Sequence, residues 1–341
     1  ALPILTYEKK HELNIGADLG FLDNRINLTV DWYKRDNFDL IGRVMTQGIG
    51  GQIQKYGNVA TMKSRGIEFS LSTKNIKTKD FSWTTDFIYS HMKNEVTKFN
   101  TSTRAFNLVS GIGFSREGYP VNSLFSYDFR GLNEDGVPTF INEAGVLTST
   151  DINFQETERF DNLVYSGPSE PTDVGSFGNI FQYKGLRLNV FITYSFGNVV
   201  RLDPVFSSIY NDLDAMPREF RNRWMTPGDE RYTDVPAIVS SRQVRNDSKL
   251  SYAYNAYNYS TARIAKGDFI RMKEISLTYD FPKRWIKKLR MSNLALKIQA
   301  TNLFLIYADK KLNGQDPEFF NSGGVATPVP KQFTLMLKIG L

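Results

Sequence analysis

Residues His11 to Phe21 read HELNIGADLGF, and apolar and polar side chains alternate along most of this stretch. A tight turn at Leu22 to Asn24 follows, and the alternation then resumes from Ile26 to Trp32, which reads INLTVDW. Successive side chains of a β-strand point to opposite faces, so an alternating sequence has one apolar face and one polar face. The two stretches and their turn therefore predict an amphipathic β-hairpin.

The same alternation recurs through the rest of the chain. The predicted strands run to about ten residues, beyond the usual length of about five or six. The further alternating stretches are residues 67–72, 81–90, 186–196, 294–301 and 333–341.

The connections between these stretches alternate between very short and very long. Leu22 to Asn24 and Lys184 with Gly185 are the short turns. Short turns on one side and long loops on the other are typical of outer-membrane β-barrels, whereas a soluble β-sandwich explains only the alternation. We therefore predict an all-β, antiparallel transmembrane barrel. Its long extracellular loops are expected at 37–65, 92–174, 197–267 and 307–330.

The mean hydropathy of −0.36 agrees with such a barrel, because only every second residue of a strand faces lipid. We count about nine transmembrane strands. If the C-terminus is periplasmic, both terminal strands run inward and residues 1–10 lie outside the cell. An odd, open set would leave unpaired edges in lipid, so we expect a part of a longer barrel.

One predicted strand, Asp268 to Phe281, does not alternate in a single phase. Ile275 and Leu277 set a phase that would also turn Arg271 and Lys273 toward lipid. A β-bulge would reset the phase and turn Ile270 and Met272 outward instead. Alternatively, the two cations lie at the outer rim and contact lipid phosphates.

Composition excludes several other classes of function. The chain has no cysteine and only two histidines, His11 and His91, so neither thiol chemistry nor a histidine metal site is indicated. The net charge of +6 is modest and scattered, which does not favour nucleic-acid binding. Aromatic residues make up 13%, which suits the interfacial girdles of a barrel. We expect no enzyme, no metal and no cofactor.

A series of short motifs resembles the C-terminal barrel half of SusC-type TonB-dependent transporters. Each motif is weak alone, but their order and spacing cover essentially the whole chain. They are Tyr7-Glu8, residues 14–21, Asn24-Arg25-Ile26, Asp31-Trp32-Tyr33, Gly57-Asn58-Val59, residues 65–68, residues 175–184, Arg223-Trp224, residues 227–229, residues 268–273, residues 300–304 and Asp316-Pro317-Glu318.

The resemblance implies the C-terminal strands, from the fourteenth on, of a 22-stranded barrel in the Gram-negative outer membrane. Such transporters import oligosaccharides or peptides with a SusD-type surface lipoprotein as a lid. TonB supplies the energy through an N-terminal part, and neither the plug nor the TonB box occurs in this sequence. The chain departs from the usual pattern at Leu341, where these barrels commonly end in an aromatic residue.

The candidate contact residues lie in the predicted loop 197–267. Aromatic faces stack on sugar rings, and Tyr, Trp and Arg dominate protein interfaces, so this loop is expected to dock the lipoprotein or contact substrate. Packing of the aromatic side chains inside the loop is the equally weighted alternative. The candidates are Tyr252, Tyr254, Tyr257, Tyr259, Arg221 and Trp224.

Three other groups of residues have stronger structural interpretations than chemical ones. Asp203, Asp212 and Asp214 lack the spacing of a calcium loop. The glycines at 48, 50 and 51 are not followed by the Lys-Ser or Lys-Thr pair of a phosphate loop. The carboxylates of Glu68 and Asp86 could mimic a glycosidase pair, but charges facing a barrel lumen are commoner.

Two competing functions remain at this stage, a siderophore-type receptor and a soluble extracellular sugar-binding β-sandwich. For a barrel, the alternation predicts which side chains face lipid and which face the lumen. Leu28, Ile192 and Leu335 are expected on the lipid face, and Asn14, Glu68 and Lys297 on the lumen face.

Overall fold

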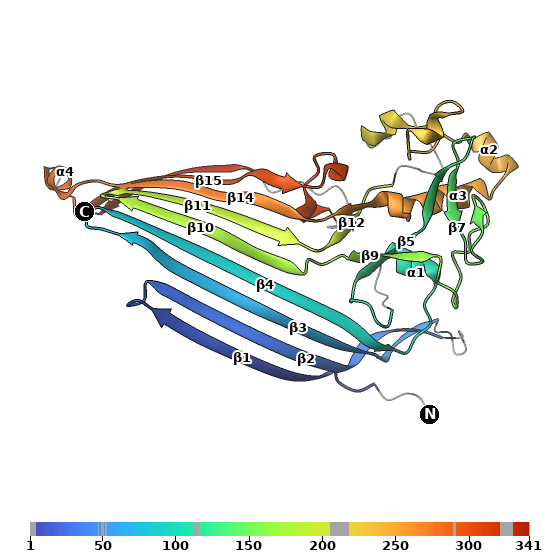
Figure 1. Ribbon diagram of the computed structural model, residues 1–341, viewed down its shortest axis with the longest axis horizontal. Coiled ribbons are helices and arrows are strands. Elements are labelled where there is room, and N and C mark those ends of the chain that lie inside the picture. Colours follow the sequence, from blue (N-terminus) through green and yellow to red (C-terminus); the bar gives the residue numbers. More distant parts are fainter. Residues whose placement is uncertain are drawn as a thin grey trace.

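Nine long strands form one antiparallel sheet in the computed structural model of the protein, in the order β1-β2-β3-β4-β10-β11-β14-β15-β16 (Figure 1). The structure describes residues 5–46, 48, 51, 53–111, 116–204, 218–288, 291–320 and 330–340. The strands of this sheet are β1 (Lys9–Phe21), β2 (Ile26–Met45), β3 (Gln54–Lys77), β4 (Phe81–Phe99), β10 (Asp173–Tyr183), β11 (Leu186–Phe196), β14 (Phe269–Asp280), β15 (Asn293–Ala308) and β16 (Gln332–Gly340).

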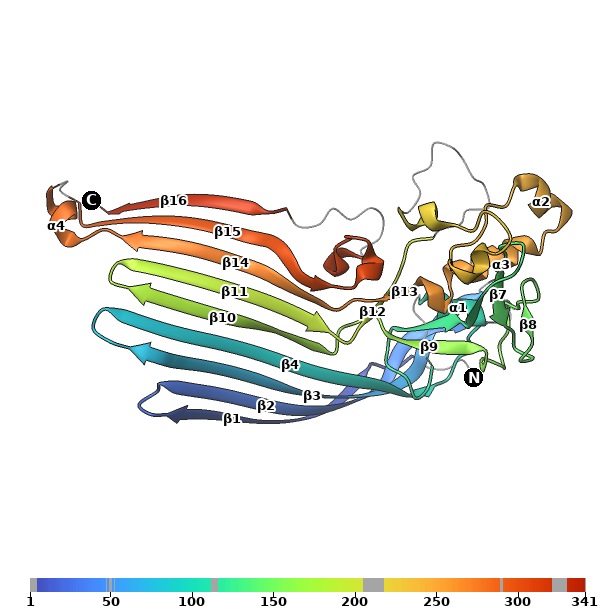
Figure 2. The ribbon, with the colours of Figure 1, turned by 45° about the horizontal axis from the view of Figure 1, so that its top comes forward.

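The two ends of the sheet differ, as the alternation of connections predicts. The tight turns and the short helix α4 (Lys283–Lys288) gather at one end, the turn end, and the long connections gather at the other, the loop end (Figures 1 and 2). Leu22, Asp23 and Asn24 all take φ near +55°, at 55°, 55° and 58°. Such left-handed residues close the first hairpin within a few residues.

The register of the sheet separates an apolar face from a polar face. Directly opposed residues of neighbouring strands project to the same face. Leu28 and Ile192 thus share a face, because Leu28 opposes Leu71, and the same row continues through Phe87 and Phe177 to Ile192. Leu335 belongs to this face as well, through Ile298, Leu277 and Leu188, and Asn14, Glu68 and Lys297 lie on the opposite one.

The apolar face of the sheet is uncovered by other parts of the described chain. Leu335 is 71% exposed and Phe177 41% exposed. A β-sandwich would bury this face under a second sheet. The other sheets of the described residues have only two or three strands, and they lie beyond the loop end (Figure 2). No helix of the described chain is both long enough and apolar enough to cross a membrane.

A β-bulge resolves the phase conflict in strand β14. Phe191 opposes Glu274 and the next residue, Ile192, opposes Met272, so Lys273 is the extra residue. The bulge places Met272 on the apolar face with Ile192, and Arg271 on the polar face. The bulge interpretation is therefore confirmed, and Arg271 is buried rather than placed at a lipid-facing rim.

The segment 37–65 differs from its prediction as a loop. β2 continues to Met45 and β3 begins at Gln54, so paired strands occupy most of this range. Glycines and polar residues replace the alternation here, because a hairpin that extends beyond the membrane has no lipid-facing side to keep apolar. The backbone hydrogen bonds continue regardless of that pattern.

Two of the other three predicted loops fold together into a body that we call the loop cap, made of the described residues of 100–172 and 197–267. Its elements are α1 (Ala105–Ser110), β5 (Ser123–Tyr127), β6 (Phe129–Leu132), β7 (Pro138–Ile141), β8 (Leu147–Thr148), β9 (Leu163–Pro168), β12 (Val199–Arg201), η1 (Arg218–Asn222), η2 (Asp229–Arg231), α2 (Ser241–Asn246), α3 (Leu250–Asn258), η3 (Thr261–Arg263) and β13 (Ile264–Lys266). In the connection 309–320, η4 (Lys310–Leu312) and η5 (Pro317–Phe319) follow β15.

Candidate partner-binding surface of the loop cap

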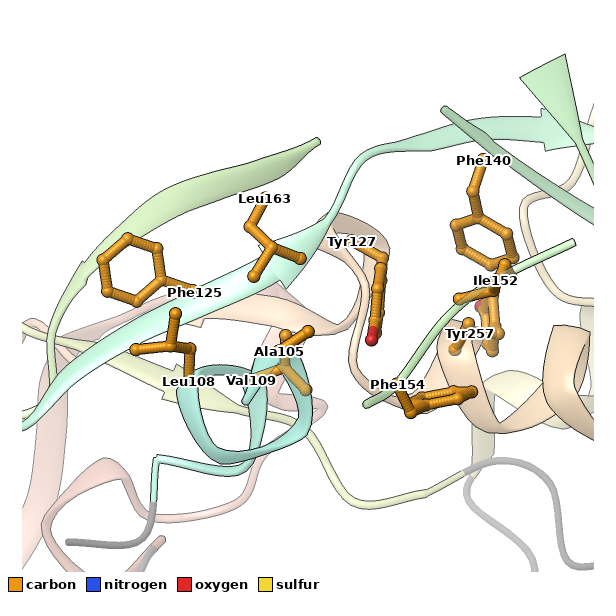
Figure 3. Packing of buried hydrophobic residues seen from close by; sticks show 11 residues of the cluster. Ala105, Leu108, Val109, Phe125, Tyr127, Phe140, Ile152, Phe154, Leu163 and Tyr257 are labelled. Atoms are coloured by element: carbon orange, nitrogen blue, oxygen red, sulfur yellow. The ribbon is translucent and has the colours of Figure 1, made fainter. Parts of the chain in front are cut away.

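The loop cap has a hydrophobic core of its own, built from both long connections. Helix α1 and strand β5 supply Leu108, Phe125 and Tyr127, and Tyr257 comes from helix α3 (Figure 3). The rings meet edge to face, as between Tyr127 and Phe154, whose centroids lie 5.3 Å apart at 75°. Aromatic pairs prefer this geometry. The cap is therefore a folded unit and not a pair of independent loops.

Helix α3 sorts two of the candidate tyrosines into this interior. Tyr254 and Tyr257 are three residues apart, so they lie on one face of the helix. Each is only 1% exposed. The Tyr254 hydroxyl donates to the Ala237 carbonyl at 2.8 Å, and burial raises the pKa of Tyr257 to about 12. These two side chains serve packing within the cap, which is the alternative that the sequence left open.

The other two tyrosines are placed differently. Tyr252 is 48% exposed and touches the rest of the cap through Phe154, with ring centroids 5.9 Å apart. Tyr259, directly after α3, packs edge-on against Phe106 at 5.6 Å, and the Arg201 guanidinium lies 5.5 Å from its ring centre. Among the four tyrosines, Tyr252 is thus the one whose ring is available to a partner.

Trp224 and Arg221 also have separate positions. Trp224 is half-buried, and its indole Nε1 donates to Glu230 Oε2 at 3.1 Å. Its ring lies over Gly136, where a Cβ would come within 2.5 Å of Trp224 Cδ2. Arg221 is exposed on η1. Trp224 therefore holds the cap together, and Arg221 remains on its surface.

Buried arginines, which the sequence analysis did not single out, connect the parts of the cap. Arg263 is 2% exposed and pairs with Glu219 at 2.5 Å. Arg201 donates from Nη2 to the Phe125 carbonyl at 2.7 Å and to Ser126 Oγ at 3.2 Å. Burial, with Arg263 nearby, lowers the pKa of Arg201 to about 10. Arg201 thus joins the β12–β13 stem, which leads from the sheet, to strand β5 of the cap.

A third buried arginine ties the connection after β15 to the sheet. Arg271, on the polar face of β14, is 4% exposed and forms an ion pair with Asp316. Its Nε lies 3.2 Å from Glu318 Oε2. Asp316 also accepts from the Glu318 backbone N–H at 3.1 Å, where η5 begins. Removing one partner of such a buried pair is strongly destabilising.

Among the described residues, the two carboxylates Glu68 and Asp86 do not form a catalytic pair. Glu68 opposes Ser90 whereas Asp86 opposes Ser72, so the two carboxylates lie four residues apart along the sheet. That is about 13 Å at the usual strand rise, beyond the separation of a glycosidase pair. Of the residues weighed against a calcium loop and a phosphate loop, Asp212, Asp214 and Gly50 lie outside the described residues.

Several apolar and aromatic side chains remain on the surface of the cap. Its exposed apolar and aromatic side chains include Tyr252 at 48%, Met225 at 62% and Tyr232 at 88%. Arg221 adds an exposed cation on the same stretch of chain. Aromatic residues, Met and Arg are enriched in protein interfaces, and a folded support lowers the ordering cost of binding.

Comparisons with known proteins agree with the fold. No family model matches the chain. The TonB-dependent receptor SusC of Bacteroides thetaiotaomicron is 27% identical over 99% of this chain and 32% of its own length. The TonB-dependent receptor P3 of Formosa agariphila is 26% identical over 92% of this chain and 31% of its own length. The chain thus spans about a third of the length of the curated relatives it matches.

Among solved structures, one of the RagAB peptide transporter superimposes with a TM-score of 0.73 and 24% identity, over 98% of this chain and 35% of that chain. A structure of the RagAB peptide importer in the closed-closed state superimposes with a TM-score of 0.74 and 23% identity, over 99% and 36%. These similarities show the same fold.

Proposed function

We propose that this outer-membrane β-barrel chain, whose homologues are TonB-dependent receptors including SusC, forms part of the wall and mouth of a transporter for oligosaccharides or peptides. The loop cap would lie on the extracellular side and dock a SusD-type lipoprotein that closes over the substrate. The energy would come from TonB. The homologues are receptors and not enzymes, which agrees with the separation of Glu68 from Asp86.

One observation carries the docking part of this proposal. The cap has a packed interior but leaves Tyr252, Met225 and Tyr232 exposed on the stretch that the buried arginines and Trp224 hold in place. A monomer that folded its loop only to cover the barrel mouth would have no need of exposed rings there. The rigid presentation of aromatic side chains favours a protein partner, for which they act as anchors.

The experiment is co-purification of the surface lipoprotein with the full-length protein from membranes. A deletion of residues 252–259 would remove Tyr254 and Tyr257 from the core, so surface substitutions are needed instead. Tyr252→Ala with Arg221→Ala should lower lipoprotein recovery at least about tenfold, the loss typical of one interface anchor. Trp285→Ala, at the turn end, is the matched control for removal of a half-exposed aromatic side chain.

Two outcomes would count against docking through this surface. Unchanged recovery with the double variant would exclude Tyr252 and Arg221 as anchors. An equal loss with Trp285→Ala would show that removal of any exposed aromatic residue disturbs the complex. The siderophore alternative is tested separately, because uptake of a labelled ferric siderophore in place of oligosaccharide or peptide would support it.

A further inference from the structure

Three cations form one row across the outward, apolar face of the sheet near its loop end. Lys34 of β2 directly opposes Arg65 of β3, and Arg65 directly opposes Lys93 of β4. All three side chains are exposed. We call these three residues the cation row. They share a face with Trp32 and Ile67, which lie two residues closer to the turn end on β2 and β3.

The cation row makes no contact with the described chain that would stabilise the fold by charge pairing. Within the described residues, none of its members takes part in an ion pair. Like charges directly opposite each other on adjacent strands are destabilising. On the polar face, at the same position along the strands, the cation is paired. There, Arg35 Nε pairs with Glu12 at 2.8 Å, and its guanidinium lies 4.1 Å from the centre of the Tyr33 ring.

The rows on either side define a boundary. The next row toward the loop end is mixed, because Asp36 opposes Lys63 and Lys63 opposes Glu95. Neither acid lies within ion-pair distance of the cation row. The next row toward the turn end contains Trp32 and Ile67, each 38% exposed, and His91, whose Nδ1 lies 2.8 Å from Asp173 Oδ1. Lys63 thus has an acid directly opposite it on each neighbouring strand, whereas no member of the cation row has an acid of the described chain directly opposite it.

We propose that the cation row binds the phosphate groups of an anionic lipid in the outer leaflet of the membrane. Its acyl chains would lie over the apolar rows that begin with Trp32 and Ile67. Neighbouring strands are about 4.8 Å apart, so the three cations span about 10 Å and can contact one or two phosphates. Arg65 suits bidentate phosphate binding, and the lysines act as point charges.

A membrane source of the phosphate is favoured over a soluble one by position. The row shares its face with exposed apolar side chains and not with the polar face, on which Arg271 and its carboxylates lie. This inference rests on the proposed function only in requiring that the sheet spans the outer membrane with the cap outside. It does not depend on which substrate is transported or on whether a lipoprotein docks.

The test measures lipid retention by the full-length protein in detergent, by native mass spectrometry. The probe is bisphosphorylated lipid A, compared with lipid A from which both phosphates have been removed. Each basic residue near an anionic membrane surface contributes roughly fivefold to binding. The triple variant Lys34→Gln, Arg65→Gln, Lys93→Gln should therefore retain the bisphosphorylated lipid about a hundredfold more weakly. The dephosphorylated lipid should bind both proteins equally weakly.

The matched control removes three exposed cations from the loop cap, by Arg242→Gln, Arg245→Gln and Lys249→Gln, and should leave retention unchanged. The triple variant of the cation row loses no partner, so its thermal stability in detergent should not fall. Equal retention by the two variants would overturn the proposal. Competition by millimolar inorganic phosphate as effectively as by the lipid would overturn the membrane source. Lipoprotein co-purification should be unaffected by the triple variant. A failure of lipid binding can therefore be distinguished from a failure of lipoprotein docking.

Discussion

Helix α3 allows the packing of the loop cap to be tested with two tyrosines five residues apart. Tyr257 is 1% exposed, its ring meets Phe129 edge to face at 5.5 Å, and the Arg263 guanidinium lies 5.9 Å from it. Truncation of a fully buried aromatic side chain costs about 3–5 kcal/mol. Tyr252 is 48% exposed with one ring contact, so Tyr252→Ala should cost about 1 kcal/mol.

The two substitutions should therefore separate clearly in hydrogen exchange. A difference of about 2–4 kcal/mol corresponds to at least about thirtyfold in the opening equilibrium of the cap. Amides of α3 and β5 should lose this much more protection in Tyr257→Ala than in Tyr252→Ala. Amides of strands β10 and β11 serve as the internal control and should keep their protection in both. Equal loss of protection in the two variants would refute the assignment of Tyr257 to the core and Tyr252 to the surface.

Three further predictions concern the sheet and the cap. Leu335→Arg should destabilise the membrane-inserted protein by about 2–4 kcal/mol and Thr334→Arg should not; equal heat-induced unfolding of the two on gels would show that the face assignment is wrong. Gly136→Ala should cost the cap about 1–3 kcal/mol, because φ there is +73° and the Cβ would meet Trp224; unchanged proteolysis of the cap would contradict this. The backbone amides that donate to Asp229 lower the pKa of its carboxyl, so this turn gains stability above the ordinary pKa of about 3.9 and loses it as the pH falls through the lowered value. In Asp229→Asn, hydrogen exchange of this turn should no longer show the acid-induced loss of stability. A loss that persisted in the variant would contradict the assignment to Asp229.

Much of the membrane-facing sheet could be predicted from the sequence, because lipid on one side and polar surroundings on the other force strict alternation. Strand β11 is an example, since apolar and polar residues alternate from Leu186 to Phe196 with Phe191 as the exception. Even the bulge at Lys273 was visible as a change of phase. The extension of β2 and β3 through 37–65 could not be predicted, because glycines such as Gly42 and Gly57 interrupt the alternation there while the backbone pairing continues.

The interior of the cap was harder to predict. A run of tyrosines looks the same whether it packs inside a loop or contacts a ligand. Helical spacing was the available signal, because Ala253, Tyr254, Ala256 and Tyr257 form one buried face of α3, and Tyr252 lies off it. No local pattern marks Arg263 as buried, since its partner Glu219 is 44 residues away in the chain.

The orientation of the chain in the membrane is the central claim, and cysteine labelling tests it most directly. The chain contains no cysteine, so a single introduced thiol reports on one position against the unsubstituted protein. Tyr232→Cys places it on the cap, where the side chain is 88% exposed, and Lys79→Cys places it in the exposed turn between β3 and β4. In intact cells, a membrane-impermeant maleimide should label position 232 but not position 79. Position 79 should react only after the outer membrane is opened. Labelling of position 79 in intact cells, with position 232 protected, would contradict the account.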